Sequence, residues 1–161
     1  MRAGLLALPL ALAATGVPAQ TAAPADPTSF AAAADVQATV AAMARGLKPG
    51  QHFAWQPLVR DGVSVAAVEY WTAPGRPAVH PADAEYTIVI AGAGTLVSGG
   101  RLVDASVTRA DLTEGSRIEG GTTRPLKPGD TMLIPAGTPH WFGVEGGRLV
   151  LLGIKLPRPA R

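Results

Sequence analysis

The chain of 161 residues contains no cysteine. This absence excludes disulfide bonds, lipid attachment through cysteine and a thiol nucleophile, so the fold must be stabilised by its hydrophobic core. The sequence also lacks a Gly-x-Ser-x-Gly elbow, a phosphate-binding loop and a Gly-x-Gly-x-x-Gly motif after a predicted strand. It therefore offers no support for nucleophilic serine chemistry or for nucleotide binding.

Charge of one sign is not concentrated anywhere along the chain. The formal net charge is +2, and no stripe of Lys and Arg alternates with aromatic residues in the way typical of nucleic-acid binding. We therefore expect no nucleic-acid partner. The Pro-rich basic segment 156–161 is interpreted as a solvated end.

The apolar run near the start of the sequence is shorter than the roughly 20 residues that a membrane-spanning helix needs. Met1 and Arg2 precede this run, which ends near small residues that form a cleavage position at Ala19. Residues 1–19 therefore predict a secretory signal peptide, and the mature protein is expected in the periplasm or outside the cell without a membrane anchor. Residues 20–28, rich in Ala and Pro, predict a disordered linker.

Residues 29–48 predict one helix, running from about Phe30 to Arg45. Ser29 is a suitable N-cap, Gly46 a suitable C-terminal residue, and Pro49 prevents the helix from resuming. A single apolar stripe at helical spacing comprises Val36, Val40, Met43 and Leu47. We expect the helix to pack on the outside of a sheet.

Residues 51–157 read almost entirely as short strands. Asp61-Gly62 predicts a hairpin between strands 51–60 and 63–72, and Gly92-Ala93-Gly94 predicts a turn between strands 85–91 and 95–98. Further strands are predicted at 101–107, 116–119, 122–126, 131–134, 140–144 and 148–156. Many short strands separated by glycines indicate an all-β sandwich or barrel.

The strand 85–91 is apolar on a face that must also be covered. Tyr86, Ile88 and Ile90 share that face, opposite the face of Glu85. The helix can cover part of it and a twofold-related copy the rest, so a homodimer is one expected state and a monomer the other.

The stretch Gly129–His140 is the most specific pattern in the chain. A turn at Lys127–Asp130 leads into a short apolar strand, and Pro135-Ala136-Gly137 ends it before the chain returns to His140. Glycine, five residues, Pro-x-Gly, two residues and histidine is a spacing that resembles the second motif of the cupin superfamily. A histidine held between two rigid turns is well placed to bind a metal.

An upstream stretch resembles part of the first cupin motif. Gly75, His80, Glu85 and Gly92 have the spacing of that motif, but Ala78 stands where its first histidine would be. The resemblance covers about 51–157 and implies an antiparallel jelly-roll β-barrel, preceded in this chain by the N-terminal helix. It is similar to small single-domain bacterial cupins.

The resemblance implies a metal site made of His80, Glu85 and His140. Because the segment between His80 and Glu85 is a poor strand, a bend there allows both side chains to point inward. Two imidazoles and one carboxylate with open positions suit a divalent ion, namely Fe, Mn, Ni or Zn. The alternative is a cupin that has lost its metal, in which these side chains form hydrogen bonds inside the barrel.

Three functions stay open on the sequence. One is a metal-dependent, oxygenase-like enzyme acting on a small organic substrate; the second is a non-catalytic module that binds a small molecule or metal; the third is a scaffold. No general base is assigned. His52 is a candidate for the position vacant at Ala78, although a structural role is the ordinary one, and Asp83 is interpreted as a solvated loop carboxylate.

Overall fold

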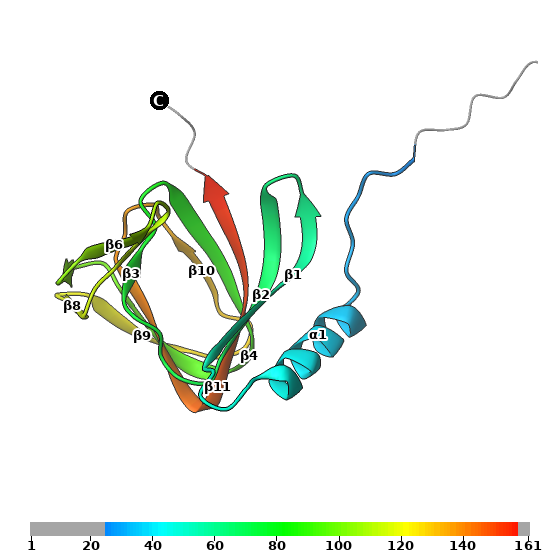
Figure 1. Cartoon of the computed structure of the whole chain (residues 1–161), viewed down its shortest axis with the longest axis horizontal. Coiled ribbons are helices and arrows are strands. Elements are labelled where there is room, and N and C mark those ends of the chain that lie inside the picture. The colour runs from blue at the N-terminus through cyan, green and yellow to red at the C-terminus, as the bar shows by residue number, and fades with distance from the viewer. Residues whose placement is uncertain (1–24, 158–161) are drawn as a thin grey trace, which may run out of the picture.

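The computed structural model describes residues 25–157, so the predicted signal peptide and part of the predicted linker (20–28) lie outside the described residues. One helix, α1 (Ala33–Gly46), precedes a set of antiparallel strands (Figure 1). The strands are β1 (Phe53–Asp61), β2 (Ser64–Trp71), β3 (Ala78–Val79), β4 (Asp83–Ser98), β5 (Arg101–Val103), β6 (Ser106–Arg109), β7 (Leu112–Glu114), β8 (Arg117–Glu119), β9 (Thr122–Leu126), β10 (Thr131–Ile134) and β11 (His140–Pro157). The predicted all-β jelly-roll barrel is confirmed.

The barrel is built around its two longest strands, β4 and β11. β4 and β11 pair antiparallel from one end to the other, and β11 also pairs with β2, while β4 pairs with β9 and β10. β3, β7 and β6 extend the sheet, and the separate pair β5–β8 lies at the end of the barrel far from α1 (Figure 1).

The prediction of two strands across Gly92–Gly94 is wrong, because β4 runs through these residues without a turn. A Cβ on Gly92 would lie 2.1 Å from the carbonyl oxygen of Arg148, and one on Gly94 would lie 2.1 Å from that of Gly143. The glycines therefore permit β4 and β11 to approach closely instead of reversing the chain.

Irregularities in both long strands decide which side chains face inward. The pairing shifts between Glu145 and Leu149, where β11 gains residues relative to β4. A regular strand would place His140 and Lys155, an odd number of residues apart, on opposite faces. The shift brings both into the barrel, and this is what completes the site described below.

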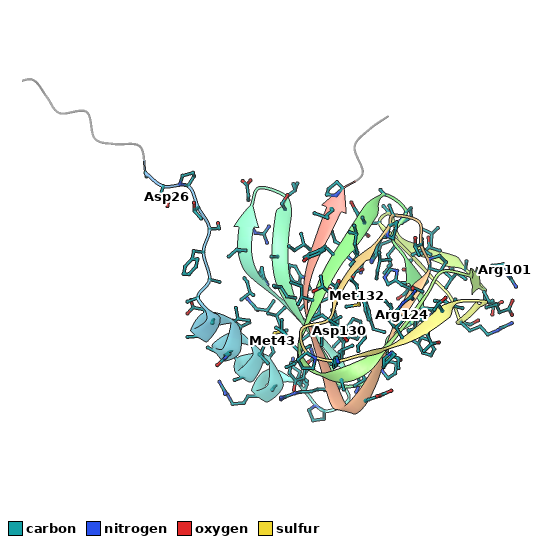
Figure 2. All side chains as sticks on the ribbon, turned by 180° about the vertical axis from the view of Figure 1, so that it is seen from behind. Asp26, Met43, Arg101, Arg124, Asp130 and Met132 are labelled. Carbon is teal, nitrogen blue, oxygen red and sulfur yellow. The ribbon has the colours of Figure 1, made fainter. Side chains whose placement is uncertain are left out.

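One hydrophobic cluster fills the barrel and another lies between the barrel and the helix. The inner cluster contains Val89, Leu96, Leu126, Ile134, Phe142, Leu149 and Leu151. Met43 of α1 packs on Val68, Tyr70 and Val150 from outside the barrel. Figure 2 labels Met43 at the helix. The expectation that the helix covers the outer face of the sheet is confirmed.

The helix is shorter than the predicted 29–48. The hydroxyl of Ser29 donates to the carbonyl of Arg60 at 2.8 Å, so Ser29 fastens the entering chain to β1 instead of capping the helix. At the start of the helix, the backbone N–H of Ala32 donates to the carboxylate of Asp35 at 2.9 Å, so this N–H has a hydrogen-bond partner. Among residues 25–157, no helix has both the length and the apolar character needed to cross a membrane.

The predicted hairpin between β1 and β2 forms one residue further along than expected. Asp61 pairs with Ser64, so the two-residue connection is Gly62-Val63, with Gly62 at a φ of 55°. The strand predicted at 101–107 is divided into β5 and β6, and β6 forms a hairpin with β7. The strand predicted at 116–119 is present as β8, which begins one residue later. The strands predicted at 122–126 and 131–134 have the predicted bounds.

Candidate metal centre

Three different segments bring the predicted metal ligands together. His80 follows β3, Glu85 lies near the start of β4, and His140 is the first residue of β11. The bend at Pro81-Ala82 allows His80 and Glu85 to face the same way. One side-chain ligand atom from each residue lies within 4.8 Å of the others. The two closest approaches are from Glu85 Oε2 to His140 Nε2, at 3.2 Å, and to His80 Nε2, at 3.6 Å.

Backbone carbonyls fix the orientation of both imidazoles. His80 Nδ1 lies 3.0 Å from the carbonyl of Asp111, and His140 Nδ1 lies 3.0 Å from the carbonyl of Thr138. Because a carbonyl only accepts, each Nδ1 carries the proton and donates it. Both rings are thereby held with Nε2 facing Glu85, which is the orientation that metal-binding histidines need.

Glu85 is an ionised carboxylate inside the barrel, with only 3% of the residue exposed. Burial on its own raises the pKa of Glu85, but the hydrogen bond from His140 and the charge of Lys155 outweigh it and hold this pKa well below its usual range. The hydroxyl of Thr87 donates to Oε1 at 3.2 Å. Oε2 is therefore the oxygen directed at the imidazoles.

Lys155 is a fourth member of the site that the sequence motif did not indicate. It is the cross-strand partner of Glu85, its Nζ contacts Glu85 Oε2, and it donates to His80 Nε2 at 2.8 Å. Burial and this ammonium group lower the pKa of His80, so the imidazole is neutral at pH 7. A count of alternate residues from buried Leu149 would have placed Lys155 on the inner face.

Glu69 is the second functional side chain that sequence reasoning missed. It lies on β2 and lines the same cavity, and Trp71 Nε1 donates to its Oε2 at 3.2 Å. Burial of the carboxyl group and the charge of Glu85 raise the pKa of Glu69 to about 7. Its place in an apolar strand, where a carboxylate is rare, was the available sequence signal.

These groups line one cavity, which has a volume of about 700 Å³. Five aromatic side chains line it, namely Phe53, Trp55, Trp71, Trp141 and Phe142, and they include all three tryptophans of the chain. Arg76 and Arg109 also line it, and each contacts a carboxylate, at 3.7 Å to Glu114 and 3.2 Å to Asp111. The volume is that of a small-molecule site.

The remaining sequence candidates lie elsewhere. His52 Nδ1 lies 3.2 Å from the hydroxyl of Thr72, and neither His52 nor Asp83 lines the cavity, so the idea that His52 fills the position vacant at Ala78 is wrong. Ala78 pairs with His140 and does line the cavity. Its methyl group leaves room there for water or a ligand.

The donor set of the site fits a divalent transition metal. Two imidazole nitrogens and one carboxylate oxygen converge from rigid segments, and their orientations are fixed by second hydrogen bonds. The ammonium of Lys155 now contacts two of the same three ligand atoms. A bound metal ion and this ammonium group therefore compete for His80 and Glu85.

Comparisons with known proteins show the fold of this chain but do not show a family to which it belongs. No family model matches the sequence, and no curated protein matches it. The structure is similar to the DMSP lyase DddQ from Ruegeria pomeroyi DSS-3, with 21% identity over 84% of this chain and 70% of that one and a TM-score of 0.53. It is also similar to the hydroquinone 1,2-dioxygenase PnpCD, with 20% identity over 73% of this chain and 70% of that one and a TM-score of 0.52. This chain has their fold.

Proposed function

From the cupin fold of this chain and the donor set inside it, we propose a metal-dependent enzyme that acts on a small organic substrate with dioxygen as co-substrate. The observation that carries this proposal is that His80 Nε2, Glu85 Oε2 and His140 Nε2 lie close together in the wall of one cavity. The described lyase and dioxygenase share the fold, so the fold alone does not select the reaction.

The proposed metal ligands and the groups that hold them have distinct roles. Asp111 and Thr138 hold the imidazoles through their carbonyls, and Glu85 supplies the negative charge. A bound Fe, Mn, Ni or Zn ion would supply Lewis acidity at the open positions and, for the redox-active ions, electrons for dioxygen. The small side chain of Ala78, which pairs with His140 and lines the cavity, would leave room for a substrate beside such an ion.

Glu69 is the proposed proton carrier of the reaction. Its Oε2 accepts from Trp71, which leaves Oε1 to take a proton from a substrate in the cavity or to return it. A carboxyl group with a pKa of about 7 exchanges protons readily at neutral pH in either direction. This residue supplies the general base that the sequence analysis could not assign.

A non-catalytic binding module is the second candidate, and one observation favours it. Lys155 satisfies His80 and Glu85 without a metal, so the same barrel is a stable polar core around an ion pair. The cavity then holds a small molecule without transforming it. Metal content and turnover separate the two functions.

The proposal includes export and self-association. The signal-like segment 1–19 supports a periplasmic or secreted protein, and N-terminal sequencing of the exported protein should find a start just after Ala19 or a few residues on. An outward apolar face supports a homodimer, because Leu133 is 61% exposed and Leu156 43% exposed beside half-buried Tyr86, Ile88 and Ile154. Contiguous apolar surface of this kind marks an interaction site.

The experiment that tests the enzymatic proposal combines metal analysis with oxygen consumption. The protein as isolated is analysed for metals and then supplied with catechols, keto acids and sugars in an oxygen electrode. Bound metal in about one equivalent with consumption of dioxygen supports the enzyme. Tight binding of a panel compound with no consumption of dioxygen supports the module, with or without bound metal, and absence of metal after loading contradicts the enzyme.

A further inference from the structure

Building on the proposed function, we propose that the cavity binds an aromatic carboxylate. Its ring lies against the tryptophan wall, and its carboxylate pairs with Lys155 Nζ beside the metal position. The inference names the substrate class of the site and rests on metal binding by His80, Glu85 and His140.

The apolar wall consists of indole and phenyl rings held in place by specific contacts. Trp141 Nε1 donates to the carbonyl of Gly75 at 2.8 Å, and Trp71 Nε1 donates to Glu69. A Cβ on Gly75 would lie 2.7 Å from the ring of Trp71, so the missing side chain lets this indole pack against the loop. Both N–H groups are engaged within the protein, and the ring carbons are left for a ligand.

Two more rings extend this wall towards the cavity mouth. The ring of Phe53 lies 4.1 Å from that of Trp71 between centroids, at an interplanar angle of 38°. Phe53 is 39% exposed and Trp55 is 48% exposed, although both line the cavity. Large aromatic surfaces of this kind gain stability when an aromatic ligand stacks on them. A short keto acid has no ring to stack, and a sugar presents C–H groups instead of an aromatic face.

Lys155 supplies the charge that selects an anion. The other cavity-lining cations among the described residues are arginines, and each has a carboxylate partner, Glu114 for Arg76 and Asp111 for Arg109. The ammonium of Lys155 contacts His80 Nε2 and Glu85 Oε2, the atoms that a metal ion would take. Glu85 Oε1 already accepts from Thr87. Metal binding therefore leaves the ammonium without these contacts inside a partly apolar cavity, where a ligand carboxylate restores an ion pair.

The nearby carboxyl of Glu69 also lines the cavity, and its Oε2 accepts from Trp71 Nε1. Burial and the charge of Glu85 raise the pKa of Glu69 to about 7, so below neutral pH this carboxyl is mostly uncharged and competes little for the ammonium. A cavity of about 700 Å³ has room for a ligand of one or two rings. The combination of a flat apolar wall and one cation at its end defines an aromatic carboxylate rather than a neutral aromatic compound.

The test measures ligand binding by quenching of tryptophan fluorescence, because all three tryptophans line the cavity. Benzoate, benzamide and cyclohexanecarboxylate are titrated into protein whose metal content has been measured. We expect benzoate to bind about tenfold or more tightly than either of the others, since one loses the charge and the other the aromatic face. Equal affinity for benzoate and benzamide, or for benzoate and cyclohexanecarboxylate, would overturn the inference.

Two variants test whether Lys155 is the cation that binds the ligand carboxylate. They are Lys155→Met and, as the matched control at an exposed position, Lys127→Met. The expected result is a loss of about tenfold in benzoate affinity for Lys155→Met, unchanged benzamide affinity, and wild-type behaviour of Lys127→Met. Unchanged benzamide affinity also shows that the variant has folded. Unchanged benzoate affinity in Lys155→Met contradicts the inference while leaving the proposed metal centre intact. Failure of the wild-type protein to hold metal contradicts the proposed function itself.

Discussion

Lys155 and Glu85 face each other across the β4–β11 pair, and their charged groups meet between the two histidines of the site. Glu85 is almost completely buried, whereas the Lys155 side chain is 39% exposed. The lysine is thus the partner that is open to solvent and lines the cavity, and the carboxylate is the enclosed one. The pair holds the site together before a metal arrives, and metal binding has to break it.

Replacing Lys155 by Met should strengthen metal binding and weaken the metal-free fold. Removal of the ammonium takes away both a competitor and a repulsive charge, so we expect metal affinity to rise about tenfold or more in a chelator competition. The metal-free variant should lose about 1–3 kcal/mol of stability in urea unfolding, because buried Glu85 is left without its cation. A fall in metal affinity would show that Lys155 does not compete with the metal.

Glu69→Gln should change how stability depends on pH. The folded-state pKa of Glu69 is raised to about 7 by burial and Glu85, with Lys155 and His140 acting in the opposite direction. A raised pKa gives the wild type a stabilising contribution that is complete below the unfolded value of about 4.5 and is lost as pH rises towards 7. Gln keeps an acceptor for Trp71 without ionising. The stability of Glu69→Gln relative to wild type should therefore increase by about 1–3 kcal/mol between pH 5 and pH 8.

Thermal or urea unfolding at several pH values checks this prediction. Glu145→Gln, at an exposed position, is the matched control and should show no such change relative to wild type. A difference between Glu69→Gln and wild type that stays constant from pH 5 to pH 8 would remove Glu69 as the proposed proton carrier.

Leu133→Lys should dissociate the proposed homodimer. Leu133 lies on β10 opposite Tyr86 and is the most exposed residue of the outward apolar face, so a lysine there places charge in the proposed interface. Size-exclusion chromatography with light scattering should give a dimer mass for the wild type and a monomer mass for the variant. Val107→Lys, at an exposed apolar position on β6, is the control and should remain dimeric. A monomeric wild type would end the dimer proposal.

The motif spacing predicted which side chains meet, because turns are local and their residues are readable. Pro135 and Gly137 fix the approach to His140, and the bend after His80 places it beside Glu85, as the spacing predicts. The helix start was misplaced because Ser29 bonds to Arg60, a residue far along the chain. Such a long-range partner has no local sequence signature.

Lys155 could not be placed from His140, because the shift between Glu145 and Leu149 reverses the strand parity. A count from Leu149 gives the right face only once that face is known to be the inner one, and the apolar run 149–152 does not reveal it. Glu69 had a signal, a carboxylate in an apolar strand, but it holds no position in either motif. The turn predicted at Gly92 and Gly94 is wrong for a related reason. In a sequence, a glycine that allows two strands to approach closely cannot be distinguished from a glycine that reverses the chain.

The most direct test of the metal centre is mass-spectrometric metal analysis of the wild type, His140→Ala and His52→Ala after identical metal loading and desalting. His140 offers Nε2 to the site, whereas His52 bonds to Thr72 outside the cavity and serves as the matched control. We predict about one equivalent of divalent metal in the wild type and in His52→Ala, and its loss from a folded His140→Ala. Equal metal content in all three proteins, or none in the wild type, would contradict a centre built from His80, Glu85 and His140.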